Sequence, residues 1–270
     1  MLEKIKNIKH LNSKNFFLIA GPCAIEDKDA SIYIAEEILR ICAKLKIPFI
    51  FKGSYRKANR SKIDSFETIG IIEALSILKN IGETLNVPTI TDVHSVEEVE
   101  IAAQYVDILQ IPAFLSRQTD LIIKAAKTKK PVNIKKGQFM SPESINHAIN
   151  KIKKNNNKNI MVTDRGTMFG YQDLVVDIRS IPIIKKLNVP IIMDVTHSNQ
   201  KPNQIDGITS GDSEMIETIS KASIAAGANG IFIETHPNPS KAKSDSQSML
   251  PLPELESLLK KLVRIKKSIN

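Results

Sequence analysis

Residues Phe16–Ser54 read FFLIAGPCAIEDKDASIYIAEEILRICAKLKIPFIFKGS. This segment contains an apolar run, an amphipathic stretch and a second apolar run. The outer runs, Phe16–Pro22 and Pro48–Ser54, have the length and the Ile and Phe content of buried strands. The stretch between them, from about Lys28 to Lys46, has apolar residues at helical spacing. A strand, a helix and a second strand in this order predict a parallel βαβ unit.

The same alternation continues to the end of the chain. Further strands are predicted at Pro88–His94, Ile108–Phe114, Pro131–Lys136, Asn159–Gly166, Val189–His197 and Gly230–His236. Further helices are predicted at about Thr68–Leu85, Val96–Gln104, Asp120–Lys127, Pro142–Lys153, Ile181–Leu187, Ser213–Ala226 and Pro253–Ser268. Eight units in 270 residues predict a single-domain (β/α)8 TIM barrel over residues 1–270, with a short N-terminal extension at about residues 1–14. A doubly wound open sheet is the alternative, although no GxGxxG motif follows the first strand.

Composition limits the class of protein. Apolar residues make up 42 % of the chain, which predicts a packed core. The formal net charge of +9 fits either a solvated lysine-rich surface or an attraction for anionic small molecules. No basic stretch contains interleaved aromatic residues, so we expect no nucleic-acid partner. The chain has only two cysteines, which is typical of a reducing compartment, and it shows no signal-peptide pattern. It also has no run of about 20 apolar residues that could span a membrane. We therefore expect a cytoplasmic protein with no membrane partner.

Polar side chains occur where the predicted strands end. In a barrel, the carboxyl ends of the strands meet at one mouth, where active sites lie. Burying this many ionisable groups without a ligand would cost several kcal/mol each, so their convergence predicts a functional site. The strand-end residues are Cys23, Lys52, Ser54, Asp92, His94, Gln110, Lys135, Lys136, Asp164, Arg165, Asp194, His197, Glu234 and His236.

One subset of the mouth residues is cationic: Lys52, Lys57, Arg60, Lys135 and Arg165. Arginine binds phosphate or carboxylate with a planar fork, and lysine binds them as a point charge. Each of these residues taken alone could be an ordinary surface cation. Together they predict a site for a small molecule with two or three negative charges.

A second subset contains Cys23, His197, Glu234 and Asp245. A thiolate, an imidazole and two carboxylates suit a divalent transition metal such as Zn, Fe, Mn or Co. No local metal motif is present, and each residue has another interpretation. Cys23 could be a small core residue, His197 a general acid or base, and Asp245 a solvated loop residue.

Eight segments of the chain resemble the 3-deoxy-D-manno-octulosonate 8-phosphate synthases. The resemblance runs from about Asn15 to the C-terminus and is in register with all eight strand ends. The segments are AGPCAIE (Ala20–Glu26), FKGSYRKANRS (Phe51–Ser61), TDVH (Thr91–His94), LQIPAFLSRQTDL (Leu109–Leu121), VNIKKGQFMSP (Val132–Pro142), TDRGTMFGY (Thr163–Tyr171), MDVTHS (Met193–Ser198) and FIETHPNPSKAKSDSQSMLP (Phe232–Pro251).

The resemblance implies a transferase that condenses phosphoenolpyruvate, arabinose 5-phosphate and water in lipopolysaccharide biosynthesis. It implies that Lys57 faces phosphoenolpyruvate, with Lys52 and Ser54 beside it. It further implies that Asn59 binds the sugar hydroxyls, and that Arg60 and Ser61 bind the sugar phosphate. By the same resemblance, the clamp for the phosphate and carboxylate of phosphoenolpyruvate consists of Gln110, the backbone amide of Ala113, Lys135 and Arg165. The residues to which it gives catalytic roles are Lys57, Asp92, Lys135 and His197.

The resemblance also implies the metal-dependent subclass, whose members have cysteine where the others have asparagine. Cys23 occupies that position, and His197, Glu234 and Asp245 match the other three ligands. Two departures affect the prediction. The segment after MDVTHS reads NQKPNQIDG, which leaves the role of the Asn199–Gly211 loop open, and Gly53 and Arg56 stand where a small residue and aspartate are expected.

Other functions remain as alternatives. A 3-deoxy-D-arabino-heptulosonate 7-phosphate synthase would use erythrose 4-phosphate, but KANRS differs from the KPR-type segment expected of it. A sialic-acid-type synthase would have an additional C-terminal domain. A Schiff-base aldolase would use Lys52 or Lys135, and a non-catalytic phosphosugar-binding barrel would bind without turnover. The resemblance also implies a homotetramer, with Arg60 or Ser61 reaching a neighbouring site.

Overall fold

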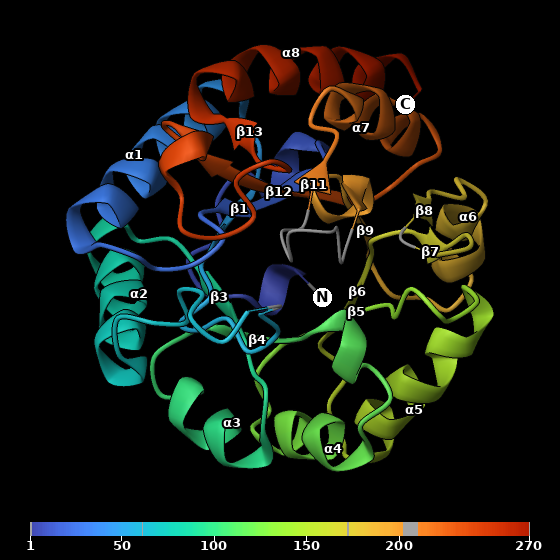
Figure 1. Ribbon diagram of the computed structural model, residues 1–270. Coiled ribbons are helices and arrows are strands. Elements are labelled where there is room, and N and C mark those ends of the chain that lie inside the picture. The colour runs from blue at the N-terminus through green and yellow to red at the C-terminus, as the bar shows by residue number, and fades with distance from the viewer. Residues whose placement is uncertain (1, 61, 172, 202–209, 270) are drawn as a thin grey trace.

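The computed structural model describes residues 2–60, 62–171, 173–201 and 210–269. Its centre is a ring of parallel strands surrounded by helices (Figure 1). The strands of this ring are β1 (Phe17–Gly21), β2 (Phe49–Lys52), β3 (Thr89–Asp92), β4 (Ile108–Ile111), β5 (Val132–Lys135), β6 (Ile160–Asp164), β9 (Ile191–Asp194) and β12 (Gly230–His236).

The ring is closed. The strands pair in parallel in chain order, and β12 pairs with β1 from Phe17 opposite Gly230 to Gly21 opposite Glu234. The predicted (β/α)8 barrel is therefore confirmed, and the open-sheet alternative is wrong. Gly21 is required where β1 meets β2, because a Cβ at this position would lie 1.9 Å from the carbonyl oxygen of Lys52.

The helices pack their apolar faces against the outside of the barrel (Figure 1). Asp27 begins the first helix by accepting a hydrogen bond from the backbone N–H of Ala30 at 2.8 Å. Lys46 ends it in the left-handed conformation, with φ of 54°. The helices are α1 (Lys28–Leu45), α2 (Ile71–Leu85), α3 (Val96–Ala102), α4 (Thr119–Lys127), α5 (Asn146–Lys154), α6 (Ser180–Lys185), α7 (Met215–Ala225) and α8 (Leu252–Ser268).

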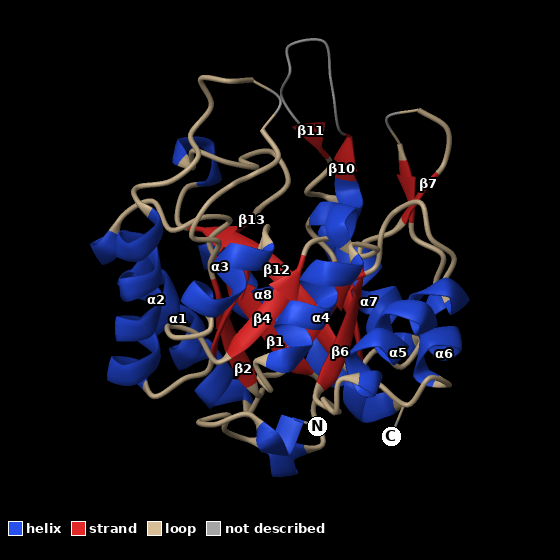
Figure 2. Ribbon diagram, turned by 90° about the horizontal axis from the view of Figure 1, so that it is seen from below, coloured by secondary structure: helices blue, strands red, loops and turns tan. Residues whose placement is uncertain are grey.

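The N-terminal segment lies beneath the barrel, on the side opposite the long loops (Figure 2). Ile5 is 4 % exposed and belongs to a cluster inside the barrel that includes Phe17, Ile50 and Met161. Leu2 and Ile8 pack against the same cluster. The first residues thus cover the apolar lower end of the barrel interior, and the upper end is left for polar side chains.

Several short elements lie outside the predicted pattern. Two antiparallel pairs rise at the upper end of the barrel (Figure 2), β7 (Thr167–Met168) with β8 (Leu174–Val175) and β10 (Gln200–Lys201) with β11 (Ser210–Gly211). A short strand, β13 (Leu250–Pro251), pairs with β12. Among the described residues, no helix has both the length and the apolar character to cross a membrane. The 3-10 turns are η1 (Leu2–Lys4), η2 (Leu11–Ser13), η3 (Ala113–Leu115), η4 (Glu143–Ile145), η5 (His197–Asn199) and η6 (Pro239–Lys241).

Candidate active site

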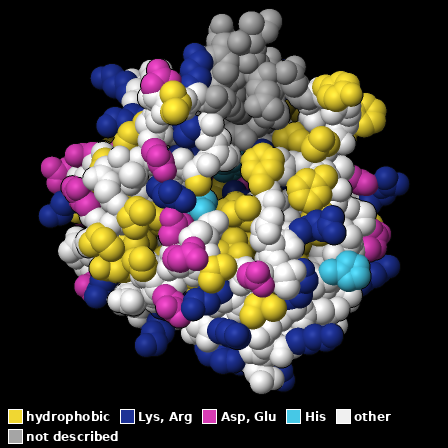
Figure 3. Space-filling model, turned by 60° about the horizontal axis from the view of Figure 1, so that its bottom comes forward, with side chains coloured by type: hydrophobic (Ala, Val, Ile, Leu, Met, Phe, Trp, Pro, Cys, Tyr) yellow, Lys and Arg dark blue, Asp and Glu magenta, His cyan; other side chains and the backbone are white. Residues whose placement is uncertain are grey.

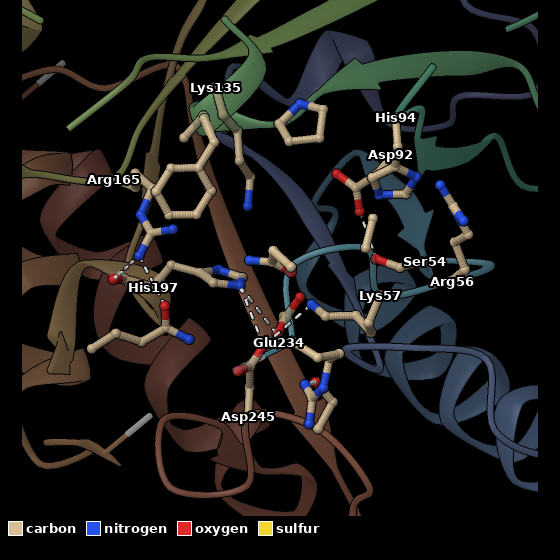
Figure 4. Close-up of a pocket in the computed structure, with 18 of the residues that line it drawn as sticks. Ser54, Arg56, Lys57, Asp92, His94, Lys135, Arg165, His197, Glu234 and Asp245 are labelled. Carbon is tan, nitrogen blue, oxygen red and sulfur yellow. Dashed lines mark hydrogen bonds and ion pairs between the residues drawn. The ribbon is translucent and has the colours of Figure 1, made fainter. Parts of the chain in front are cut away.

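A cavity of about 720 Å³ opens at the carboxyl ends of the strands. Its volume is in the range of sites for small molecules. Figure 4 shows side chains from several strands extending into this space, with Lys135, Arg165 and His197 on one side and Ser54, Asp92 and Lys57 on the other. The predicted site residues that line it are Lys52, Ser54, Lys57, Asn59, Arg60, Asp92, Ala113, Lys135, Arg165, His197, Glu234 and Asp245.

Three predicted site residues are placed differently. Cys23 and Gln110 are fully buried and lie behind the side chains that line the cavity. Cys23 Sγ is 2.9 Å from Asp245 Oδ2 and is therefore adjacent to the cavity wall. Gln110 reaches the cavity through Asp92, to which its side-chain amide donates a hydrogen bond. Ser61 lies outside the described residues.

Lys52 is a buried cation with acidic partners. Its Nζ is 2.6 Å from Glu234 Oε1, 2.8 Å from the carbonyl oxygen of Cys23 and 4.0 Å from a carboxylate oxygen of Asp92. Burial alone would lower the pKa of Lys52, but Glu234 and Asp92 raise it above its ordinary value. Lys52 is therefore charged at neutral pH and is not a free amine.

Lys57 is held between a thiol and a carboxylate. Its Nζ lies 3.1 Å from Cys23 Sγ and 3.3 Å from Asp245 Oδ2. Burial opposes its charge, but the attraction of Cys23 and Asp245 raises the pKa of Lys57 well above its ordinary value. A permanent ammonium group thus projects toward the centre of the cavity (Figure 4).

The residues of the second sequence subset lie together at one side of the cavity, and Figure 4 shows His197, Glu234 and Asp245 pointing toward one another. One ligand-type atom from each of Cys23, Glu234 and Asp245 lies within 4.8 Å of the other two. His197 Nε2 is 3.5 Å from Glu234 Oε2 and 3.9 Å from Asp245 Oδ2. Glu234 Oε2 is buried and forms no hydrogen bond with any described residue. This oxygen lies near His197 Nε2 without a hydrogen bond, and in a set of soft and hard donors it fits a divalent transition metal.

Asp194 orients two of the site residues. Its Oδ2 lies 2.7 Å from Lys135 Nζ and 2.8 Å from His197 Nδ1, while its Oδ1 accepts a hydrogen bond from the backbone N–H of His197 at 2.9 Å. Burial would raise the pKa of Asp194, but His197 and Lys135 hold it well below its usual range. With Asp194 Oδ2 2.8 Å from its Nδ1, His197 presents Nε2 to Glu234 and Asp245, as metal-binding histidines do. Asp194 stands at a polar strand end in the sequence, but nothing in its local pattern indicates this bridging position.

Arg165 is buried beside the same histidine. Its guanidinium group donates to the carbonyl oxygen of His197 at 3.1 Å and to Gln200 Oε1 at 2.8 Å. Burial lowers its pKa, but an arginine remains charged. Its Nε has no hydrogen-bond partner among the described residues, so the side chain has a free donor. Gln200 was not among the predicted site residues, and only the fold brings it to Arg165.

The outer part of the cavity is also basic. Arg60 donates to Ser244 Oγ at 2.7 Å, and its Nε has no partner in the described part of the chain. Lys62 and Lys243 line the cavity with it, and Asn59 lies next to Arg60 in the same loop. This loop connects β2 to α2 and thus starts at a strand end, so it extends over the mouth of the barrel.

A further group of side chains lies behind Arg56 at the edge of the cavity. Glu98 accepts a hydrogen bond from Tyr55 Oη at 2.6 Å and lies 3.0 Å from Arg56 Nε and 3.4 Å from His94 Nδ1. Its position follows from Ser95, which begins α3 and accepts a hydrogen bond from the backbone N–H of Glu98. The sequence indicates that Arg56 is unusual, but it does not identify Glu98 as its partner.

Comparison with known proteins places the chain among sugar-phosphate synthases. A model of the DAHP synthetase I family matches residues 2–270. The chain is 46 % identical over 258 residues to a 2-dehydro-3-deoxyphosphooctonate aldolase of Trichlorobacter lovleyi, covering 96 % of this chain and 95 % of the relative. It is 48 % identical over 267 residues to a protein of the same name from Fusobacterium nucleatum, covering 99 % and 96 % of the two chains.

Proposed function

The chain belongs to the DAHP synthetase I family, and from this premise we propose that it condenses phosphoenolpyruvate with D-arabinose 5-phosphate and water. The products are 3-deoxy-D-manno-octulosonate 8-phosphate and inorganic phosphate. The chain is an enzyme of the transferase-type synthase class. Its product would be used in building the inner core of lipopolysaccharide.

The observation that carries this proposal is the charge of the cavity. Lys57 and Arg60 from the β2–α2 loop, Lys135 at the end of β5 and Arg165 after β6 line the same space of about 720 Å³. Two substrates with two phosphates and a carboxylate repel one another in water. Fixed cations offset this repulsion and hold the two molecules at a reacting distance.

The reaction forms one carbon–carbon bond and breaks one carbon–oxygen bond. C3 of phosphoenolpyruvate bonds to the aldehyde carbon, water adds to C2, and phosphate leaves with its bridging oxygen. One proton of the water balances the new hydroxyl group, and the other leaves with the phosphate. In this proposal Lys57, Lys135 and Arg165 bind phosphoenolpyruvate, and Arg60 binds the sugar phosphate. Asp92 accepts a proton or a hydrogen bond from water.

We further propose that the enzyme is metal-dependent, with Cys23, His197, Glu234 and Asp245 as ligands. Two observations support this assignment: Glu234 Oε2 is buried without a hydrogen bond to any described residue, and Asp194 lies 2.8 Å from His197 Nδ1. When bound, Zn, Fe, Mn or Co would supply Lewis-acid or template chemistry. Asp245 has a left-handed φ of 50°, a conformation that functional sites retain at a cost in stability.

The assembly and compartment are also proposed. We propose a homotetramer, as the resemblance implies. Exposed side chains on and near the β7–β8 hairpin support a contact between subunits: Phe169 is 72 % and Tyr171 99 % exposed, and Phe139 is 51 % exposed. Figure 3 shows hydrophobic side chains gathered on one face of the molecule among charged ones. A cytoplasmic location is supported by Cys23 and Cys42, which are both free thiols.

The test is phosphate release from phosphoenolpyruvate with arabinose 5-phosphate or erythrose 4-phosphate, each with and without a strong chelator. We expect release with arabinose 5-phosphate, loss in chelator and recovery with a divalent metal. Phosphate release that persists in chelator would contradict the proposed metal dependence but would still support the proposed synthase activity. Preference for erythrose 4-phosphate would favour the heptulosonate synthase instead.

The Schiff-base alternative is disfavoured by the geometry. A Schiff base requires a neutral amine, which is usually obtained by desolvation or by neighbouring cations. Lys52 is paired with Glu234 at 2.6 Å, which raises the pKa of Lys52 and stabilises its ammonium form, and Lys135 Nζ is engaged by Asp194 at 2.7 Å. Borohydride with pyruvate should therefore trap no covalent adduct.

A further inference from the structure

A chain of buried hydrogen bonds crosses the barrel beneath the cavity. Thr163 Oγ1 donates to Asn133 Oδ1 at 2.9 Å, and Asn133 Nδ2 donates to Gln110 Oε1 at 2.8 Å. Gln110 Nε2 donates to Asp92 Oδ1, and Ser54 Oγ donates to Asp92 Oδ2 at 2.5 Å. The first four residues belong to the neighbouring strands β6, β5, β4 and β3, and Ser54 follows β2.

The hydrogen bonds in this series all run in one direction, from Thr163 toward Asp92. An ionised carboxylate only accepts hydrogen bonds, so Gln110 has to present its N–H to Asp92. Its Oε1 then faces Asn133 and needs a donor, which is Asn133 Nδ2. Asn133 Oδ1 in turn needs a donor, which is the hydroxyl group of Thr163. Thr163, Asn133 and Gln110 are all 0 % exposed, so water cannot replace a lost partner without entering the core.

We propose that Thr163 and Asn133 are positioning residues, which fix the amide of Gln110 and thereby hold the Asp92 carboxylate in one orientation at the cavity wall. Neither residue lines the cavity, so each acts through Gln110 and Asp92. The inference rests on the proposed function, in which Asp92 accepts a proton or a hydrogen bond from water. A carboxylate that is fixed in place needs no reorientation when the reaction begins.

The main contribution of this chain of hydrogen bonds is the orientation of the carboxylate, because the bond from Gln110 favours the ionised form of Asp92 less than Lys52 and Lys135 do. The cations that face Asp92 are Lys52 on β2, Lys135 on β5 and the nearby Lys57, and His94 lies two residues after the end of β3. These groups favour the ionised form of Asp92 whether or not the amides are aligned. Removing the Thr163 hydroxyl should therefore lower kcat through misplacement of the carboxylate, while KM for phosphoenolpyruvate stays near its wild-type value because Arg165 and Lys135 are untouched.

The experiment compares Thr163→Val with Thr163→Ser, which keeps the hydroxyl group. The matched control is Thr89→Val, because Thr89 is also buried on a strand, and its Oγ1 contacts Asp107 at the opposite end of the barrel. We expect kcat to fall about 10-fold in Thr163→Val and to stay within about 2-fold in Thr163→Ser and Thr89→Val, since misplacing a catalytic group costs about this much or more. A wild-type kcat in Thr163→Val, or an equal fall in Thr89→Val, would overturn the inference.

A second measurement does not need turnover. In wild-type protein the side-chain amide protons of Asn133 and Gln110 should give resolved NMR signals that exchange slowly with water. In Thr163→Val the Gln110 signal should shift, although Gln110 does not touch Thr163, and an unshifted signal would contradict the chain. If the wild-type enzyme released no phosphate, the proposed function would fail, but this NMR test of the chain would still stand.

Gln110→Glu provides a variant that does not depend on the folding of Thr163→Val. It keeps an acceptor for Asn133 but places a second carboxyl group against Asp92. We expect kcat to fall at least as far as in Thr163→Val. Wild-type kcat in Gln110→Glu would show that the orientation of this amide is irrelevant to the reaction and would overturn the inference.

Discussion

At the scale of the residue, the site is built from charged side chains that form ion pairs with one another. Arg56 is the clearest example, because a partly buried acid lies directly behind it. Glu98 binds Tyr55, lies beside His94 and pairs with Arg56 at 3.0 Å. Burial would raise the pKa of Glu98, but hydrogen bonds from His94 and Tyr55 lower it from 4.5 to about 2.

This shift predicts how Glu98 contributes to stability as the pH changes. The pKa is lower in the folded protein, so the contribution is complete above pH 4.5 and is lost as the pH falls toward 2. Wild-type protein should therefore lose stability more steeply than Glu98→Gln between pH 4.5 and 3, measured by urea unfolding. Glu83→Gln, at a 70 % exposed side chain, is the control and should follow wild type. Parallel curves for wild type and Glu98→Gln would contradict this account.

The proposed metal ligands give a second prediction for single residues. Cys23→Asn should reduce the metal bound per chain at least about tenfold, because the soft donor of the set is lost. The measurement is elemental analysis after purification without added metal. Cys42→Ala is the control, since Cys42 is buried on the apolar side of α1 away from the mouth and should affect stability only. Unchanged metal content in Cys23→Asn would reject the ligand set.

At the scale of the element, local signals set where helices begin and end. The structure shortens α2 relative to the predicted range, so that it begins at Ile71 rather than Thr68. Gly70 has φ of 121°, which is incompatible with a helix, so the helix begins after it. The predicted helix from Pro142 begins as the 3-10 turn η4 and becomes α-helical at Asn146.

The cap of α1 is a feature that can be measured by itself. Asp27→Ala removes the acceptor for the N–H of Ala30 and should cost about 1 kcal/mol of stability. Asp29→Ala, in the first turn of the same helix, should cost only a few tenths of a kcal/mol because it loses only the favourable interaction with the helix dipole. Denaturant unfolding gives both values, and kcat should not change in either variant. Equal losses would show that the capping bond does not contribute.

At the scale of the whole molecule, the residues that stabilise the barrel and the residues that form the candidate site lie at opposite ends of it. Its lower end is closed by Ile5 and the apolar cluster around Phe17 and Ile50, and its upper end carries the charged cavity. The charged groups at the upper end are paired across strands, as Lys52 is with Glu234 and Lys135 with Asp194. Forming such buried pairs costs desolvation, which offsets much of the attraction between the charges, so they add little to stability.

Because Ile5 closes the lower end of the barrel, far from the cavity, replacing it should lower stability without changing kcat. Ile5→Ala should destabilise the protein by about 2 kcal/mol, because it removes buried methyl groups and leaves a cavity. Ile72→Ala, at a 52 % exposed position on α2, is the control and should change stability by less than about 0.5 kcal/mol. Thermal and urea unfolding measure the difference. A loss in Ile5→Ala no larger than in the control would mean that the N-terminal segment does not seal the barrel.

The sequence by itself determined the repeating units of this protein and the end at which its polar residues gather. Apolar periodicity and turn residues act within a few positions, so the eight strands and eight helices could be predicted from Phe16 onward. The mouth residues could be predicted for the same reason, since each follows its own strand. The four proposed metal ligands could be named by resemblance. Their meeting in space depends on contacts between distant residues such as Cys23 and Asp245, which are 222 positions apart.

Only the tertiary structure decided which of these residues meet. The pairing of β1 with β12 closes the ring and brings Lys52 to Glu234, 182 positions away. The same closure sets Asp194 between Lys135 and His197 and aligns Thr163, Asn133 and Gln110 beneath Asp92. These contacts depend on strand register and on side-chain direction inside a closed barrel. Neither leaves a periodic signal in the sequence, because each partner is an ordinary polar residue within its own segment.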